Sequence, residues 1–306
     1  MKKVKFGKTG LSVSSIALGC MRLNGLDDKA AEKYLAHAID LGIDFFDHAD
    51  IYGGGECEAI FGRTANLKGD AREKVIIQSK CAIVPGKMYD FSKEHIIEAV
   101  EGSLKRLNTE YLDVLLLHRP DALMEPEEVA AAFDELETSG KVRYFGVSNQ
   151  RPSQMKLLKK CVKQDLQANQ LQFSIPVSNM VASGIEANMT SAGSYDHDGD
   201  ILNYCMLNDV TIQAWSPFQM ENWQGPFIGS DKFPELNEEL NKLGEKYGCG
   251  ATGIATAWIL RHPANMQVIA GTMNPVHLDE IVAASDIVLT REEWYRLYLA
   301  AGHQLP

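Results

Sequence analysis

Ionisable side chains are concentrated in the stretch DFFDHADIYGGG (residues 44–55), where Asp47 and Tyr52 lie five residues apart, and further ones occur at Lys80 and His118. A phenol with a pKa near ~10 is a poor acid at neutral pH, but an adjacent ammonium group would stabilise its phenolate and lower that pKa. A carboxylate would offset the cost of burying the ammonium, and an imidazole could bond and orient a carbonyl oxygen. Together, these four residue types fit proton transfer to a carbonyl group.

The same stretch allows other interpretations. Each of the four residues could by itself have a structural role, such as capping a helix or bonding a loop backbone. His48 and Asp50 resemble a pair of ligands in a metal-dependent barrel hydrolase, but such a site needs three or more convergent ligands, and the sequence has no His-x-His pair. Alternate residues of a strand share a face. We therefore predict that His48 packs behind the site, that Asp50 supports it, and that no metal is bound.

The elements that must position these residues are visible as eight β-rich runs, each followed by a segment with helical spacing of apolar residues. Several runs are almost continuously apolar, as expected for parallel strands that are covered on both faces. Eight such units predict a (β/α)8 barrel, or TIM barrel, whose catalytic groups lie at the carboxyl ends of the strands. The runs span residues 14–19, 43–48, 74–80, 113–118, 142–148, 166–173, 210–216 and 266–271.

Segments outside this repeat have predicted roles of their own. VKFGKTGLSV near the N-terminus predicts a β-hairpin that closes the bottom of the barrel, and two stretches after residue 276 predict extra C-terminal helices. Residues 174–200 and 217–233 are longer than usual connections, and long ordered loops at this face are commonly functional lids. The side chains expected to shape the pocket from these loops are those of Tyr195, Trp223 and Phe227.

Composition narrows the class of protein. The 306 residues, with 45% apolar and 23% charged side chains, fit one domain spanning residues 1–306. The net charge of −11 argues against nucleic acid or an anionic membrane surface as a partner, and no apolar run is long enough to span a membrane. Six cysteines without a CxxC pair, and no apolar stretch after the N-terminal lysines, favour reduced thiols in a cytoplasmic protein. The oligomeric state stays open.

Six motifs, in the order FFDHADIYG, IIQSK, LLLHRPD, YFGVSN, NQLQFS and AWSPF, resemble the successive landmarks of the aldo-keto reductases from about residue 4 to 290. The resemblance is closest to bacterial-type reductases whose fourth strand reads LLHRPD. It implies a barrel without a Rossmann domain, with NADP(H) extended across its mouth, that reduces aldehydes or ketones to alcohols. It also implies catalytic roles: Tyr52 is the general acid and Lys80 lowers its pKa. Asp47 is then the counter-ion of Lys80, and His118 orients the carbonyl.

The resemblance further implies where the cofactor binds. Ser148, Asn149 and Gln170 match residues that bond the nicotinamide carboxamide, and Trp215 stands where an aromatic ring stacks on the nicotinamide. The cofactor-binding residues expected in this way are Gly19, Met21, Asp47, Ser148, Asn149, Gln170, Trp215, Ser216, Phe218, Gly271, Thr272, Asn274, His277 and Glu280.

The chain departs from the family pattern at the adenosine end. Met273 and Ile281 stand where related reductases often carry arginine and asparagine. A phosphate binds best to a fixed guanidinium or to several amides at a helix start, so NAD(H) stays open as an alternative to NADP(H). Arg22 and Arg119 could supply further cations.

One functional alternative belongs to another class of protein. A barrel of this kind could bind its cofactor as a redox sensor, or as a regulatory subunit with slow turnover. The presence of all four catalytic residue types favours an enzyme that acts on a small-molecule carbonyl or alcohol, whose identity the sequence leaves open.

Overall fold

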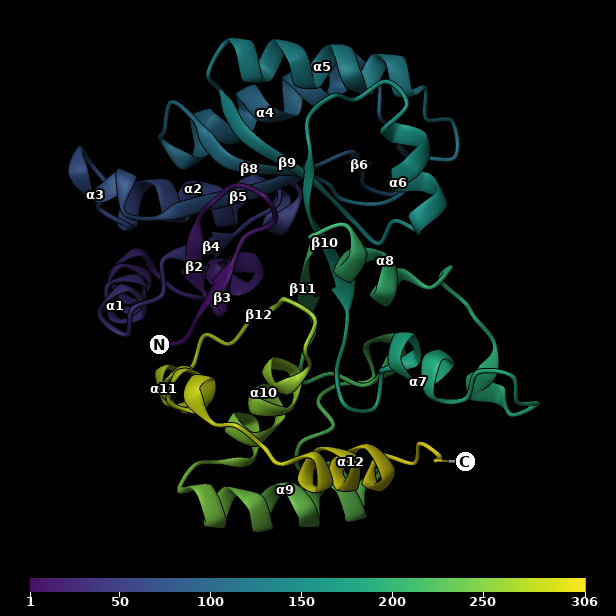
Figure 1. Ribbon diagram of the computed structural model, residues 1–306. Coiled ribbons are helices and arrows are strands. Elements are labelled where there is room, and N and C mark those ends of the chain that lie inside the picture. The colour runs from purple at the N-terminus through teal and green to yellow at the C-terminus, as the bar shows by residue number, and fades with distance from the viewer. Residues whose placement is uncertain (306) are drawn as a thin grey trace.

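Eight parallel strands close into a barrel at the centre of the computed structural model, which describes residues 1–305 (Figure 1). The strands are β3 (Ile16–Gly19), β4 (Phe45–Asp47), β5 (Ile76–Cys81), β8 (Leu112–Leu117), β9 (Val142–Ser148), β10 (Leu166–Gln172), β11 (Thr211–Trp215) and β12 (Met266–Ala270). They follow one another around the barrel in chain order, and β12 closes it by pairing with β3. The predicted (β/α)8 architecture is confirmed, and every strand begins and ends within two residues of its predicted run.

Helices follow all eight barrel strands and cover the outside of the barrel (Figure 1). In α5 the buried residues Val129, Phe133 and Leu136 have the predicted helical spacing, and Pro126 occupies the first turn, where its missing N–H costs nothing. The ring consists of α1 (Asp28–Asp40), α2 (Glu56–Thr64), α4 (Lys93–Leu107), α5 (Pro126–Thr138), α6 (Pro152–Leu158), α8 (Ile201–Leu207), α10 (Ala251–Arg261) and α11 (Pro275–Ala283). Within residues 1–305, no helix combines the length and the apolar character needed to cross a bilayer.

Two further helices, α9 (Pro234–Tyr247) and α12 (Arg291–Ala300), lie side by side outside α10 (Figure 1). The rings of Trp258 on α10 and Trp294 on α12 stack with centroids 4.7 Å apart, and each indole N–H donates to the other residue's carbonyl oxygen. Of the two helices expected after residue 276, only α12 is an addition to the barrel, because α11 packs on α1 and α10 and so completes the ring.

The remaining short elements lie in the connections. They are α3 (Asp70–Glu73), α7 (Asn179–Ile185), and the hairpin of β6 (Ile83–Val84) and β7 (Met88–Tyr89). The last of these follows β5 directly, so it stands at the rim of the barrel mouth.

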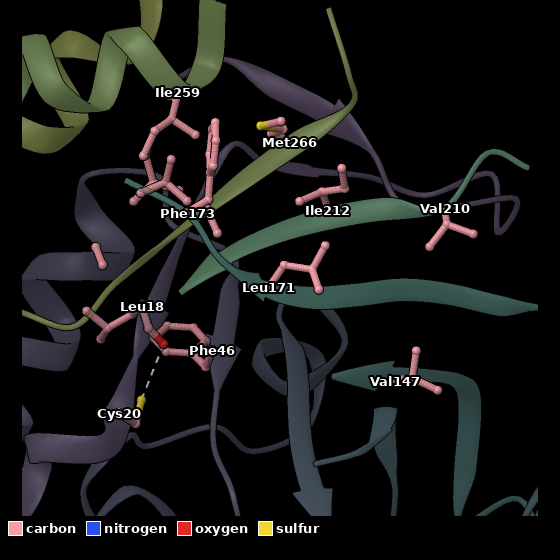
Figure 2. Close-up of a cluster of buried hydrophobic side chains, with 14 of the residues drawn as sticks. Leu18, Cys20, Phe46, Val147, Leu171, Phe173, Val210, Ile212, Ile259 and Met266 are labelled. Carbon is pink, nitrogen blue, oxygen red and sulfur yellow. Dashed lines mark hydrogen bonds between the residues drawn. The ribbon is translucent and has the colours of Figure 1, made fainter. Parts of the chain in front are cut away.

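Strand alternation separates the barrel interior from the layer beneath the helices. Leu18 and Phe46 pair across β3 and β4 and belong to the large apolar layer between barrel and helices (Figure 2). Phe45 belongs to a second, smaller cluster inside the barrel. The predicted N-terminal hairpin, β1 (Lys3–Lys5) with β2 (Ser12–Ser14), closes the barrel at the amino ends of the strands. There Phe6 is fully buried, with its ring centroid 5.4 Å from that of Phe45. Asp47, two residues after Phe45, has the same inward orientation nearer the open end.

Candidate active site

A cavity of about 840 Å³ opens at the carboxyl ends of the strands. Six of the barrel strands contribute residues to its wall, and β5 and β8 are represented by residues that follow them, Ile83, His118 and Arg119. Asp47, Tyr52 and His118 lie on this wall. Lys80 lies directly beneath them with its side chain fully buried. The four residues predicted to handle a proton therefore meet at one end of the barrel, although they are spread over more than seventy positions of the chain.

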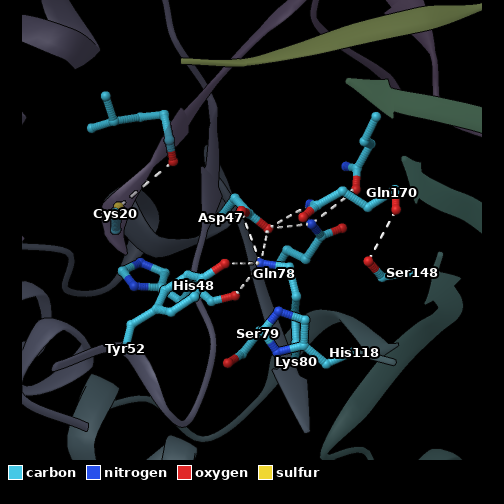
Figure 3. A network of polar contacts seen from close by, with 12 residues as sticks. Cys20, Asp47, His48, Tyr52, Gln78, Ser79, Lys80, His118, Ser148 and Gln170 are labelled. Carbon is cyan, nitrogen blue, oxygen red and sulfur yellow. Dashed lines mark hydrogen bonds and ion pairs between the residues drawn. The ribbon is translucent and has the colours of Figure 1, made fainter. Parts of the chain in front are cut away.

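The Lys80 ammonium connects the other members of the site. Its Nζ donates to Asp47 Oδ2 at 2.9 Å, to the carbonyl oxygen of His48 at 2.7 Å and to Tyr52 Oη at 3.1 Å (Figure 3). Asp47 pairs with Gln78 across β4 and β5, and Lys80 lies two residues beyond Gln78 on the same inner face. These contacts use all three ammonium protons, so the position of Lys80 is fixed by its partners.

Tyr52 reaches the site because the chain turns sharply after β4. Gly53 and Gly54 have φ of 59° and 65°, in the left-handed region that favours glycine. A Cβ on Gly53 would lie only 2.8 Å from Asn24 Nδ2, so a side chain would not fit there without a shift. This turn places the Tyr52 ring with its centroid 4.8 Å from Lys80 Nζ and edge-on to the His118 ring at 5.8 Å.

Burial controls the ionisation of Tyr52. It raises the pKa of the phenol, the Lys80 ammonium lowers that pKa by a smaller amount, and Asp47 raises it again. Lys80 therefore acts in the predicted direction, but the pKa of Tyr52 still lies above its ordinary value because desolvation disfavours the phenolate more strongly. Burial also opposes the charge of Lys80, yet Asp47 and Tyr52 outweigh it and raise the pKa of Lys80. At neutral pH the site thus holds a neutral phenol beside a charged ammonium.

His118 is a neutral hydrogen-bonding group. Burial, followed by the charges of Lys80 and Arg119, lowers the pKa of its imidazole to about 2. Its buried Nδ1 has no hydrogen-bond partner among residues 1–305. Because the ring lies on the cavity wall, it can donate a hydrogen bond to a carbonyl oxygen without carrying a charge.

Glutamines form a hydrogen-bonded chain across the barrel beneath the site (Figure 3). Gln78 Nε2 donates to Asp47 Oδ1 at 2.6 Å and to Gln213 Oε1 at 3.0 Å. Gln170 Nε2 donates to the same two oxygens, and Gln213 Nε2 donates to Gln267 Oε1 at 2.9 Å. Sequence reasoning identified only Gln170 of these. The signal for the others is a glutamine in the middle of an apolar strand, as in IIQSKC, TIQAW and MQVIA.

Comparison with known proteins decides the family. A sequence profile of the Aldo/keto reductase family matches residues 15–299. The chain belongs to the aldo/keto reductase family. It is similar to oxidoreductase YdhF of Escherichia coli (34% identical, 100% of both chains covered) and to 6-dehydroglucose reductase of Agrobacterium fabrum (33% identical, covering 96% of this chain and 97% of the relative). Its fold matches the crystal structure of an aldo-keto reductase from Klebsiella pneumoniae in complex with NADPH, with a TM-score of 0.77 and 25% identity over 97% and 93% of the two chains.

In this aldo/keto reductase, the residues expected at the nicotinamide end lie together. Ser148 Oγ donates to the carbonyl oxygen of Gln170 at 2.9 Å, and Asn149 Nδ2 donates to Ser148 Oγ at 2.7 Å. Trp215 Nε1 donates to Asn149 Oδ1 at 3.1 Å. Asn149 has a φ of 57°, a left-handed conformation that asparagine tolerates better than most residues. The four side chains make a continuous wall across the ends of β9, β10 and β11.

The residues expected further along the cofactor divide into two groups. Those on the cavity wall are Gly19, Met21, Ser216, Phe218, Gly271, Thr272 and His277. Asn274 and Glu280 lie away from that wall. Asn274 Oδ1 accepts from the backbone N–H of Val276 at 3.0 Å and so caps α11. The Glu280 carboxylate lies against Gly250 at the start of α10, where a Cβ on Gly250 would be 2.6 Å from Glu280 Oε2.

Arg22 adds a cation to the reductase cavity at the end marked by Thr272 and His277. Its Nη1 donates to the carbonyl oxygen of Gly271 at 2.9 Å, which holds the guanidinium beside β12. Sequence reasoning named this arginine without placing it. The contact to Gly271 places it beside the residues that the family resemblance implies for the adenosine part of the cofactor.

His48 and Asp50 lie behind the catalytic residues. The His48 ring packs edge-on against Phe61 of α2 at 4.5 Å, outside the barrel, as strand alternation predicts. Burial, with a further contribution from Lys80, lowers the pKa of His48 to about 3. Burial and then the charge of Glu58 raise the pKa of Asp50 to about 7. Across residues 1–305, no group of three or more His, Cys, Asp or Glu side chains could hold a metal ion.

The two long loops contribute unequally to the cavity, because six residues of 217–233 lie on its wall and none of 174–200 does. Trp223 lies on its wall and stacks on Trp215 with ring centroids 5.7 Å apart. The expectation is wrong for the other two aromatic residues. Phe227 is fully buried beneath its own loop, where Asn237 Nδ2 bonds its carbonyl oxygen, and Tyr195 is 64% exposed away from the cavity.

Proposed function

We propose that this aldo/keto reductase reduces aldehydes or ketones to alcohols with NADP(H), and that Tyr52 is the general acid. The observation that carries the proposal is the hydrogen bond from Lys80 Nζ to Tyr52 Oη at 3.1 Å. Because Oη accepts this bond, the Tyr52 O–H can donate its own proton into the cavity. His118 is placed to donate a second hydrogen bond to the same carbonyl oxygen.

The residues of the chain then direct the proton. Burial keeps the Tyr52 phenol protonated until a substrate oxygen gains negative charge. As the proton leaves, the developing phenolate lies next to the Lys80 ammonium, which stabilises it. Asp47 keeps that ammonium charged and in place. The same groups work in reverse for alcohol oxidation, which the raised pKa of Tyr52 favours only at high pH.

The cavity fits a dinucleotide. Its wall includes Trp215 and Gln170 on β11 and β10, and Thr272, His277 and Arg22 after β12 and β3. Gln170 donates through Nε2 to Asp47, which leaves its Oε1 available to accept from a carboxamide. A reduced nicotinamide bound here would supply the hydride for the carbonyl carbon. The NADPH complex of the Klebsiella pneumoniae relative supports NADP(H), and Arg22 is the cation best placed for a phosphate at the adenosine end, where Met273 offers none.

Two measurements test the proposal. NADPH should bind and quench tryptophan fluorescence, because Trp215 lies on the cavity wall, and NADPH should be consumed with one or more members of a broad aldehyde panel. Tyr52→Phe should abolish turnover while leaving the affinity for NADPH nearly unchanged. If NADPH does not bind, the proposal fails. If NADPH binds but the wild type turns over no faster than Tyr52→Phe, the chain is better described as a cofactor-binding sensor.

A further inference from the structure

Arg119 places a cation at the reacting end of the cavity, meaning the end where Tyr52 and His118 lie. It follows His118 directly, it is half-buried, and it lies on the cavity wall. Its guanidinium carbon is 5.6 Å from the centroid of the Trp215 ring. Trp215 is itself fixed by its bond to Asn149. The arginine therefore borders the space in which a carbonyl group would meet Tyr52 and His118.

Among residues 1–305, no carboxylate forms an ion pair with this guanidinium. None of the ion pairs found within residues 1–305 includes Arg119. Asp121, two residues further on, is the nearest acid in sequence, but its Oδ2 accepts from Phe91 N at 2.9 Å and its Oδ1 accepts from Leu123 N at 2.8 Å. Asp47 is the one carboxylate on the described cavity wall, and it is paired with Lys80.

The two arginines of the cavity occupy different ends of it. Arg22 follows β3 and is bonded to Gly271 beside β12, at the adenosine end. Arg119 follows β8, and its charge helps to lower the pKa of His118, which shows that it acts on the reacting end. A phosphate of the cofactor at the Arg22 end would leave Arg119 without an anion.

We propose that Arg119 binds the carboxylate of the substrate, so that the reductase prefers oxo acids, meaning aldehydes or ketones that carry a carboxylate, over uncharged carbonyl compounds. A guanidinium presents a planar fork that matches a carboxylate through two parallel hydrogen bonds. The guanidinium carbon lies over the Trp215 ring at 5.6 Å from its centroid, which is within the range of a cation–π contact. The carboxylate is unchanged in the reaction: hydride and proton add across the C=O bond, and the product is the hydroxy acid. The proposal rests on the reductase function proposed above.

A neutral sugar is the main competing substrate class, since an arginine can also donate to hydroxyl groups and two relatives are 6-dehydroglucose reductases. The unpaired charge favours an acid. A hydroxyl would leave the guanidinium without a counter-ion, whereas a carboxylate supplies one within a partly buried site.

The test compares 4-carboxybenzaldehyde with its methyl ester, which present the same aldehyde and differ in charge. Wild type, Arg119→Gln, Arg119→Lys and the matched cavity control Arg22→Gln are assayed at saturating NADPH. We expect the wild type to prefer the acid in kcat/KM by about 10-fold or more. Arg119→Gln should lower kcat/KM for the acid by about 10- to 100-fold more than for the ester, mainly through KM. Arg119→Lys should recover part of this loss, and Arg22→Gln should leave the acid-to-ester ratio unchanged.

Other results would overturn the proposal. The first is a wild type with the same kcat/KM for acid and ester, and the second is an acid-to-ester ratio that Arg119→Gln leaves unchanged. The third is a loss of kcat/KM in Arg119→Gln that is as large for the neutral hydroxyaldehyde glyceraldehyde as for the acid. If the wild type reduces none of these compounds, the reductase function is decided by the broad aldehyde panel, and the binding of benzoate followed by tryptophan fluorescence decides the role of Arg119. Benzoate binding that Arg119→Gln abolishes would support the carboxylate site, and binding that is absent or indifferent to Arg119→Gln would refute it.

Discussion

Replacing Lys80 with methionine removes the ammonium that lies 3.1 Å from Tyr52 Oη and 2.8 Å from Asp47 Oδ1. With an effective dielectric constant of about 20, a full phenolate charge at that distance is stabilised by about 5 kcal/mol. If roughly half of this charge has developed in the transition state, Lys80→Met loses about 2–3 kcal/mol, and kcat should fall about 100-fold. No reduction for solvent screening is needed, because Lys80 is fully buried.

The same substitution should also destabilise the fold. It leaves the Asp47 carboxylate, which is 2% exposed, without its counter-ion, and removing one partner of a buried ion pair costs about 3–5 kcal/mol. The double variant Asp47→Asn/Lys80→Met removes both charges, so it should unfold at higher urea than Lys80→Met alone while remaining as inactive. Initial rates of NADPH oxidation with a neutral aldehyde and urea unfolding curves measure the two effects separately.

Two outcomes would contradict this reasoning. A Lys80→Met variant whose kcat stays within about threefold of the wild type would show that the ammonium does not stabilise the reacting phenol. A double variant no more stable than Lys80→Met would show that the lone carboxylate is not the source of the instability. Since activity and stability are read from different experiments, a loss of folding cannot be mistaken for a loss of catalysis.

Three further predictions follow from the same geometry. Burial and the charge of Glu58 raise the pKa of Asp50 to about 7. The folded state therefore keeps a proton that the unfolded state releases near pH ~4, so the free energy of unfolding should fall as pH rises from about 4 to about 7. Asp50→Asn should therefore raise the free energy of unfolding at pH 8 by about 2–4 kcal/mol and change it little at pH 4, as measured by urea denaturation. The pKa of His118, lowered to about 2 by burial, means that its ring signals should not titrate in NMR spectra between about pH 5 and 8; a midpoint near ~6.5 would contradict the neutral imidazole. Gln213→Leu breaks the glutamine chain that holds Gln170, so it should lower the free energy of unfolding by about 1–3 kcal/mol and lower kcat. If both values are unchanged, the glutamine chain does not support the site.

Much of the barrel could be predicted from the chain because its signals are local. Apolar runs with polar ends, such as IDFFDH and DVLLLH, mark strands with ionisable side chains near their carboxyl ends, and this pattern predicts His118 at the cavity. Alternation along β4 was enough to separate Asp47 from His48. The same alternation rule, applied to glutamines within strands, would also have predicted that Gln78 faces the barrel interior.

Other placements depended on contacts that no local pattern contains. Tyr195 and Phe227 lie in loops of the expected length, but the packing of those loops turns one outward and buries the other. Asn274 and Glu280 stay predicted cofactor residues by the family resemblance, and the contacts by which they cap α11 and cover the start of α10 are visible only in the structure.

The sequence by itself determined the number and order of strands, the residue types at their ends and the family, because alternation, periodicity and motif order are properties of neighbouring residues. Only the tertiary structure decided that Lys80 lies within hydrogen-bonding distance of both Asp47 and Tyr52, since that distance depends on the register of β4 and β5 in a closed barrel. It also decided that burial outweighs Lys80 in setting the pKa of Tyr52, and that Arg119 faces the cavity without a counter-ion among residues 1–305. Desolvation and charge pairing depend on what surrounds a group in space, and strands far apart in the sequence supply those surroundings.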